Sequence, residues 1–144
     1  MSPQPTQLAL VRQAVLAMPM ARLLRLSFLR IEPGDVEIEL PVQDDWCHAP
    51  GRLQATAVFA AADFAAVAAA ATLLPAGTAN ATVDATLKLV APAQGTRLRA
   101  TGRVVGRPGL LTTCAADVFA IDAGGTATLC ATLLGTARTL GPAG

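Results

Sequence analysis

Few side chains in the middle of this sequence can take part in acid–base chemistry, so the ones that can are informative. Asp63 is the only ionisable residue between Arg52 and Asp84, and eleven of the seventeen residues from 55 to 71 are alanine. A carboxylate in such apolar surroundings must find a hydrogen-bonding partner or take up a proton. Asp63 is therefore a candidate for chemistry, although many aspartates in helices simply face solvent or form an ion pair.

A second group of candidates precedes the same alanine-rich stretch. His48 is the only histidine of the chain, and Gly51, Gln54 and Ala55 follow it where a helix would begin. The first turn of a helix leaves backbone N–H groups unpaired and carries the positive end of the helix dipole, which suits a developing oxyanion. We take the N–H of Ala55 as the candidate donor. Considered singly, a histidine in a loop is more often a surface or core residue, so position alone identifies no enzyme.

The hydropathy pattern predicts the elements that would hold these residues. A short helix with Thr6 as its N-cap precedes Pro19, and a long helix over 53–74 ends at Pro75 and Gly77. The apolar face of the short helix would comprise Leu8, Val11, Val15 and Met18. Alternating and apolar runs predict six strands, which are 22–31, 36–40, 81–90, 96–106, 110–121 and 126–138.

The long helix is apolar on all sides, which predicts burial on most of its surface. A sheet wrapped around this helix would provide that burial, and in the last strand Ala127 and Leu129 are expected on the face opposite Thr126 and Thr128. The expected fold class is therefore α+β, with an antiparallel sheet of about six strands around one long central helix and a short N-terminal helix. At 144 residues the chain is expected to form one domain over 1–144, with its core at about 20–138.

The composition excludes several functional classes. Hydrophobic residues make up 53% of the chain and charged residues 15%, which is unlike a disordered protein. The formal net charge of +1 and the aromatic content of 3% argue against nucleic acid as a partner. The three cysteines, Cys47, Cys114 and Cys130, are odd in number and widely spaced, so we expect reduced thiols. No spacing supports a site that uses Cys47 and His48, so no metal is expected.

The apolar stretch 53–74 is long enough to span a bilayer, but it is rich in alanine and carries Asp63 near its middle. A central Asp costs about 2.5–3.5 kcal/mol on insertion scales, so we expect a buried helix and no membrane partner. The first residues do not resemble a signal peptide. No basic region precedes the apolar run that begins at Leu8, and Arg12 and Gln13 interrupt that run. The expected location is the cytoplasm.

The spacing of the candidate residues resembles the signature of the hotdog-fold acyl-CoA thioesterases. The run His48-Ala-Pro-Gly51-Arg-Leu-Gln54-Ala55-Thr56, followed after six residues by Asp63, is similar to the pattern of the phenylacetic-acid-degradation branch. That pattern reads Asn-x-x-Gly-x-x-His-Gly-Gly, then six residues, then Asp or Glu. Segments 82–93 and 99–105 resemble the strands that follow the helix, and the resemblance covers about residues 20–138. His48 replaces the Asn of the pattern, and Gln54-Ala55-Thr56 replaces His-Gly-Gly.

The resemblance implies hydrolysis of an acyl-CoA or related thioester without a metal or other cofactor, coenzyme A being part of the substrate. It implies a homodimer or a dimer of dimers in which Asp63 of one chain faces His48 and Ala55 of the other. Asp63 would be the general base or the nucleophile, and the Ala55 N–H would stabilise the oxyanion. The other residues implied to assist catalysis are Gln54, His48 and Thr82, and those implied to contact the substrate are Gly51, Thr56 and Trp46.

The altered triplet at 54–56 leaves other functions open. A hotdog protein that binds acyl-CoA or acyl-carrier thioesters without cleaving them is the main alternative, and a hydratase or dehydratase on the same fold ranks below it. Trp46 either lines the acyl pocket or covers its loop. Arginines at 97, 99, 103 and 107 either meet the phosphates of coenzyme A or form a solvated strand face.

Overall fold

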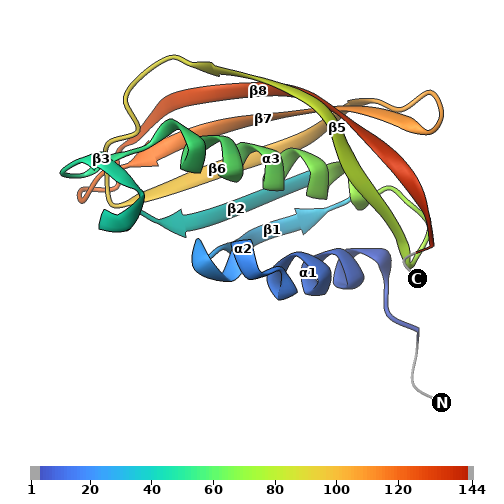
Figure 1. The fold of residues 1–144 in the computed structure, drawn as a ribbon. Coiled ribbons are helices and arrows are strands. Elements are labelled where there is room, and N and C mark those ends of the chain that lie inside the picture. Colours follow the sequence, from blue (N-terminus) through green and yellow to red (C-terminus); the bar gives the residue numbers. More distant parts are fainter. Residues whose placement is uncertain (1–3, 143–144) are drawn as a thin grey trace.

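The computed structural model describes residues 4–142, and the outer ends of the domain expected over 1–144 lie outside this part. Six antiparallel strands form one sheet in the order β1-β2-β6-β7-β8-β5, and Figure 1 shows that the sheet curves around helix α3. The strands of this sheet are β1 Ser27–Glu32, β2 Asp35–Pro41, β5 Thr78–Leu89, β6 Arg97–Gly106, β7 Leu111–Ile121 and β8 Ala127–Pro142. The expected α+β class, the six strands and the central helix are confirmed.

Helix α3 spans Ala55–Ala71 and is shorter than the helix expected over 53–74. Its 17 residues extend about 25 Å at 1.5 Å per residue. The expected start is wrong because Leu53 belongs to the short strand β4 (Arg52–Leu53), and its amide donates to the carbonyl of Ala93 at 2.9 Å. At the other end Thr72 caps the helix, and its hydroxyl donates to the carbonyl of Ala69 at 2.6 Å.

Alanine side chains allow α3 to lie unusually close to the sheet. Opposite the helix, Gly102 of β6 has no room for a side chain, because a Cβ built there would overlap the carbonyl group of Ala65. Backbone of the helix therefore packs directly on backbone of the strand. This contact fixes the height of α3 above the sheet, and with it the position of Asp63, two residues before Ala65 in the same helix.

The N-terminal region forms two helices, where the sequence predicted one. Helix α1 (Gln7–Ala17) begins as expected, and the hydroxyl of Thr6 accepts a hydrogen bond from the Ala9 amide at 3.2 Å. Pro19 then starts a second helix, α2 (Pro19–Leu23), because proline fits the first position of a helix. The strand expected over 22–31 therefore begins only at Ser27. Val11 and Val15 are buried as expected, whereas Met18 is 44% exposed.

The last strand departs from simple alternation at Cys130. Val118 of β7 pairs with Ala131, whereas Phe119 pairs with Leu129, so Cys130 is an extra residue in a β-bulge. Beyond the bulge Ala131 and Leu133 face the helix as expected. Before the bulge the alternation is reversed. Leu129 was expected on the same face of the strand as Ala131 and Leu133, but it is 40% exposed.

None of the helices within residues 4–142 combines the length and the apolar character that crossing a membrane requires.

Candidate active site

One side of α3 is not covered by the chain itself. The buried side of the helix packs on the sheet, and burial extends less far around it than the sequence predicted. The uncovered side recurs every three or four residues, which is the spacing of one helix face. Its partly or more fully exposed members are Phe59, Ala60, Asp63, Phe64 and Val67.

Asp63 is the one charged residue of this uncovered side. The adjacent strand β5 brings Thr82 to it, and the Thr82 hydroxyl donates a hydrogen bond to Asp63 Oδ1 at 2.9 Å. Half-burial raises the pKa of the Asp63 carboxyl above its usual range, and the Thr82 hydrogen bond partly opposes that shift. The structure thus brings together two of the residues that the resemblance implied for catalysis. A carboxylate with a raised pKa and room beside it is suited to accepting a proton from water.

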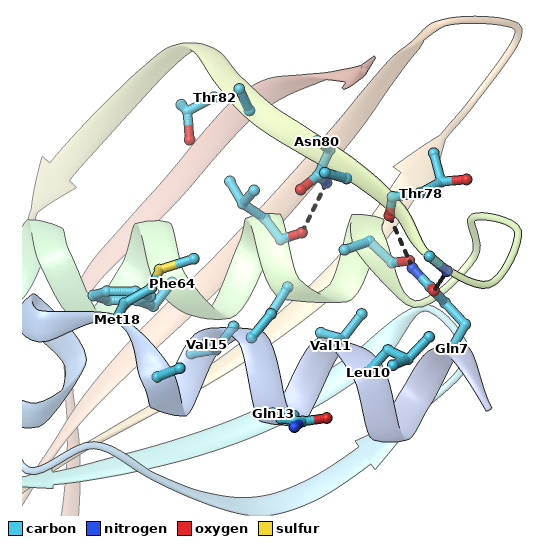
Figure 2. A pocket seen from close by; sticks show the side chains of 18 of the residues that line it. Gln7, Leu10, Val11, Gln13, Val15, Met18, Phe64, Thr78, Asn80 and Thr82 are labelled. Carbon is cyan, nitrogen blue, oxygen red and sulfur yellow. Dashed lines mark hydrogen bonds between the residues drawn. The ribbon is translucent and has the colours of Figure 1, made fainter. Parts of the chain in front are cut away.

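A cavity of about 500 Å³ lies next to Asp63, between α1, α3 and β5. Figure 2 shows Leu10, Val11 and Val15 of α1 on one side and Asn80 and Thr82 of β5 on the other. Phe64 and Val67 of α3 also line it. Among the described residues that line the cavity, Asp63 is the only ionisable one. The cavity is therefore apolar over most of its wall and carries a carboxylate at one end.

Gln7, at the first position of α1, closes the opposite end of the cavity. Its side-chain amide donates to the carbonyls of Ala71 at 2.9 Å and Thr78 at 3.2 Å, and its oxygen accepts from the Gly77 amide at 2.9 Å. The sequence analysis did not single out Gln7. No local pattern could have revealed it, because its partners are backbone groups 64 to 71 residues away.

The start of α3 holds the second group of predicted residues. Ala55 is the first residue of the helix, and Gln54 is its extended N-cap, whose side chain makes no capping hydrogen bond. The Gln54 carbonyl accepts from the amides of Ala57 and Val58. Within residues 4–142 the amides of Ala55 and Thr56 make no hydrogen bond, and both residues are exposed. Among the described residues, two N–H groups are therefore unpaired at the positive end of the helix dipole, as an oxyanion site requires.

A small hairpin leads into this helix start and carries His48. It comprises the 3-10 turn η1 (Asp44–Trp46), strand β3 (Cys47–Ala49) and strand β4 (Arg52–Leu53). His48 is exposed at a bulge in this hairpin, and Gly51 forms its turn with a positive φ of 70°. Such a φ favours glycine, which gives Gly51 a conformational role besides the predicted contact with substrate.

Trp46 belongs to the same hairpin but not to the lining of the cavity. Its carbonyl accepts a hydrogen bond from the Gln54 amide at 2.7 Å, and its half-buried ring packs against the core. Within this chain the Trp46 ring therefore packs on the core beside its hairpin, and its predicted contact with substrate stays a prediction.

Within one chain these two groups do not meet. Ala55 and Asp63 are eight residues apart in α3, which separates them by about 12 Å along the axis. If water beside Asp63 attacks a carbonyl carbon, the N–H group that stabilises the carbonyl oxygen must lie about 3 Å from that oxygen. The Ala55 N–H of the same chain is too far from Asp63 to do so. The candidate residues therefore form two separate groups at different heights along one helix, Asp63 with Thr82 and Ala55 with His48.

Three of the four arginines considered as phosphate contacts have other partners. Arg97 lies 3.5 Å from Glu39, and Arg99 lies 3.2 Å from Glu39 and 3.8 Å from Glu37, all on the face of β2 and β6 that points away from α3. Arg107 donates to the Leu73 carbonyl at 3.2 Å. Arg103 is exposed. The first two arginines thus form a charged ladder on the outer face of the sheet.

The cysteines are free, as expected. Burial raises the pKa of the Cys114 and Cys130 thiols to about 11, so both are protonated and unreactive at neutral pH. Among the described residues no group of three or more His, Cys, Asp or Glu side chains is placed to hold a metal ion.

Neither a protein-family model nor a curated protein matches this chain. Solved structures do. A thioesterase family protein from Silicibacter pomeroyi is 27% identical with a TM-score of 0.87, and the match covers 91% of this chain and 96% of the other. AziG from S. sahachiroi is 25% identical with a TM-score of 0.74, covering 86% of this chain and 98% of the other.

A more distant structure shares the fold. The E. coli PaaI protein from the phenylacetic acid degradation operon is 15% identical with a TM-score of 0.77, covering 94% of this chain and 97% of the other. At this identity the likeness concerns the fold alone. The thioesterase family protein at 27% identity matches over nearly its full length, which confirms the predicted resemblance to thioesterases of this fold.

Proposed function

Because this chain belongs to the hotdog-fold thioesterase superfamily, we propose that it hydrolyses an acyl-CoA or related thioester to the free acid and the thiol. The observation that carries the proposal is the half-buried Asp63 carboxylate, held by the Thr82 hydroxyl at 2.9 Å and lining an apolar cavity. Its raised pKa makes it a stronger base than an exposed aspartate, and its position on the uncovered side of α3 leaves room for a substrate.

In the proposed mechanism Asp63 removes a proton from water as the water oxygen attacks the thioester carbonyl. The new carbon–oxygen bond pushes charge onto the carbonyl oxygen, which the Ala55 N–H and the Gln54 side chain stabilise. The carbon–sulfur bond then breaks, and the leaving thiolate takes the proton. His48 positions the water. Alternatively Asp63 attacks the carbonyl directly as a nucleophile, and the carbon–sulfur bond breaks as the thiolate leaves. Water then hydrolyses the resulting anhydride, which releases the free acid and restores the Asp63 carboxylate.

The proposal requires a second copy of the chain, because the two halves of the site lie about 12 Å apart in one copy. Two α3 helices packed antiparallel about a two-fold axis would bring Asp63 of one copy to Ala55 of the other. Phe59 stands midway between these two residues, so in that arrangement it lies at the axis and faces its own counterpart. Phe59 is 37% exposed in the single chain, which fits a residue that a second copy covers.

The remaining expectations belong to the same proposal. Gly51, Thr56 and Trp46 lie at the helix start, where they would contact the thioester and the coenzyme A arm of the substrate. Coenzyme A takes part only as the thiol portion of the substrate, and no other cofactor enters the mechanism. The assembly would be a homodimer or a dimer of dimers in the cytoplasm.

Substitution of the proposed base tests the function. Asp63→Asn keeps the shape of the side chain but removes the base, so thiol release from acyl-CoA substrates should fall about a hundredfold or more. Asp117→Asn is the matched control, because Asp117 is also half-buried and accepts a threonine hydroxyl, from Thr132 at 2.8 Å, on the outer face of the sheet. Its activity should stay unchanged. Full activity of Asp63→Asn would refute the role of Asp63.

A further inference from the structure

The cavity beside Asp63 has a definite length. Asp63 lies at one end, and the carbonyl of Ala71, which Gln7 binds, lies at the other. Eight residues of α3 separate them, which corresponds to about 12 Å. Figure 2 shows α1 running alongside α3 over this distance, with Gln7 near Thr78 at one end and Met18 near Phe64 at the other. The space is thus a channel that α1 borders along its length.

The chemistry of the wall restricts the group that the channel accepts. The described lining residues include no cation, so the phosphates of a nucleotide would find no partner inside. The Asp63 carboxylate would repel a second carboxylate. Two polar side chains of the wall already have partners, since Asn80 Nδ2 donates to the Val67 carbonyl at 3.1 Å and Gln7 makes three hydrogen bonds. An uncharged, apolar chain is the group that fits these conditions.

We propose that this channel binds the acyl chain of the substrate, that α1 is its outer wall, and that Gln7 limits the length of chain it accepts. The inference rests on the proposed thioesterase function and adds the substrate class, which is thioesters of uncharged, apolar acyl groups of medium length. The acyl chain runs from the carbonyl beside Asp63 toward the clasp that Gln7 makes with Ala71, Gly77 and Thr78. Gln7 is a positioning residue. It takes no part in the reaction, and it limits the acyl chain by holding the backbone of Ala71, Gly77 and Thr78 together at the end of the channel.

Two substitutions should move the preferred chain length in opposite directions. Ala14 lines the channel from α1, so Ala14→Phe fills part of it and should shift the optimum to shorter acyl groups. Gln7→Ala removes the clasp and should shift the optimum to longer ones. Ala9→Phe is the matched control, because Ala9 is an exposed alanine of α1 that does not line the channel. Its chain-length profile should match that of the unchanged protein.

The measurement is kcat/KM for a series of straight-chain acyl-CoA substrates from butyryl to palmitoyl. For the longest substrate that the unchanged protein prefers, Ala14→Phe should lower kcat/KM about tenfold or more, while the value for butyryl-CoA stays unchanged. A general loss of stability would lower all values together. The inference is overturned if Ala14→Phe and Ala9→Phe give the same profile, or if the unchanged protein cleaves all lengths equally well.

A binding experiment separates failure of this inference from failure of the proposed function. Non-hydrolysable S-alkyl thioethers of coenzyme A, in the same series of lengths, can be titrated by calorimetry with coenzyme A alone as the baseline. Affinity that rises to a length limit, and a limit that Ala14→Phe shortens, support the channel even if no acyl-CoA is cleaved, in which case hydrolysis is refuted. Hydrolysis together with affinities independent of length supports the proposed function and refutes the channel.

Discussion

Two opposing influences meet at the carboxylate of Asp63. Burial against α1, α3 and β5 disfavours its charge, and the Thr82 hydroxyl favours it through a hydrogen bond. Because burial is the larger influence, the pKa is raised in the folded protein. The fold therefore holds this side chain at a cost to stability, which is common for groups whose role is chemical.

The raised pKa predicts how stability depends on pH. Above the folded pKa the native state keeps an ionised carboxylate that the unfolded chain would hydrate better, so the free energy of unfolding falls as pH rises from the ordinary value of 3.8 through the raised one. Asp63→Asn removes this penalty. The variant should be more stable than the unchanged protein at pH 7, and the gain should shrink at about pH 4.

Urea denaturation at both pH values and at one fixed protein concentration measures this effect. Asp117→Asn serves again as the matched control, because it also replaces a half-buried aspartate that accepts a threonine hydroxyl. An equal gain for Asp63→Asn at both pH values would mean that packing, and not ionisation, is responsible.

The proposed oxyanion donor can be removed without disturbing the helix. Ala55 is the first residue of α3, where proline is tolerated, and Gln54 before it is already extended with ψ of 147°. Ala55→Pro deletes the N–H and should lower kcat about a hundredfold, with an unchanged far-ultraviolet circular dichroism spectrum. Activity that survives in a folded Ala55→Pro variant would assign the oxyanion to another donor.

At the scale of single residues, the spacing from His48 to Asp63 predicted a loop followed by the start of a helix. It could do so because a hairpin and the helix after it are built from neighbouring residues of the sequence. Thr82 was predicted only through the resemblance to a known pattern, and it does contact Asp63. Gln7 could not be predicted, because its role depends on where the tertiary structure places the backbone of residues 71–78.

At the scale of elements, the contact between α3 and β6 is the most sensitive to substitution. A Cβ at Gly102 would overlap backbone atoms of Ala65, and backbone cannot turn aside as a side chain can. Gly102→Ala should therefore lower the free energy of unfolding by about 3 kcal/mol, at the upper end of overpacking effects. Gly106→Ala is the control in the same strand, because nothing lies within 4 Å of its added Cβ.

Chemical denaturation of the two alanine variants provides the comparison. Gly106→Ala should change the unfolding free energy by less than about 0.5 kcal/mol, since the added Cβ meets no neighbouring atom. Similar unfolding free energies for the two variants would mean that α3 can move away from β6 without a loss of stability.

Period-two patterning predicted most strands of the sheet, including β2, in which Val36, Ile38 and Leu40 are buried. It failed where the backbone leaves its regular repeat. The extra residue at Cys130 reverses the alternation in β8, and Pro19 starts a helix where it was expected only to end one. Hydropathy carries no signal for either event, because both depend on which backbone groups pair.

At the scale of the whole molecule, the proposed dimer would cover the uncovered side of α3. The proposed two-fold axis beside Phe59 predicts that this residue contacts its own counterpart. Phe59→Cys should therefore form a disulfide between subunits on mild oxidation, since two Cα atoms about 5.5 Å apart allow the bond. Leu29→Cys is the control, because Leu29 is exposed to 47% but lies on β1 at the far edge of the sheet.

Gel electrophoresis without a reducing agent reads out the crosslink. The buried thiols of Cys114 and Cys130 should contribute little background, given their raised pKa. Equal crosslinking of the two variants, or none in Phe59→Cys, would place the contact between subunits elsewhere.

The 12 Å that separates Ala55 from Asp63 on one helix also predicts how two defective proteins behave together. When Asp63→Asn and Ala55→Pro chains exchange partners, each hybrid pair has one site with both lesions and one site with neither. Mixing and refolding two nearly inactive preparations should therefore restore about a quarter of the normal turnover if pairing is random. If hybrids form but turnover does not recover, both groups of each site come from the same chain, and the proposed site between subunits is refuted.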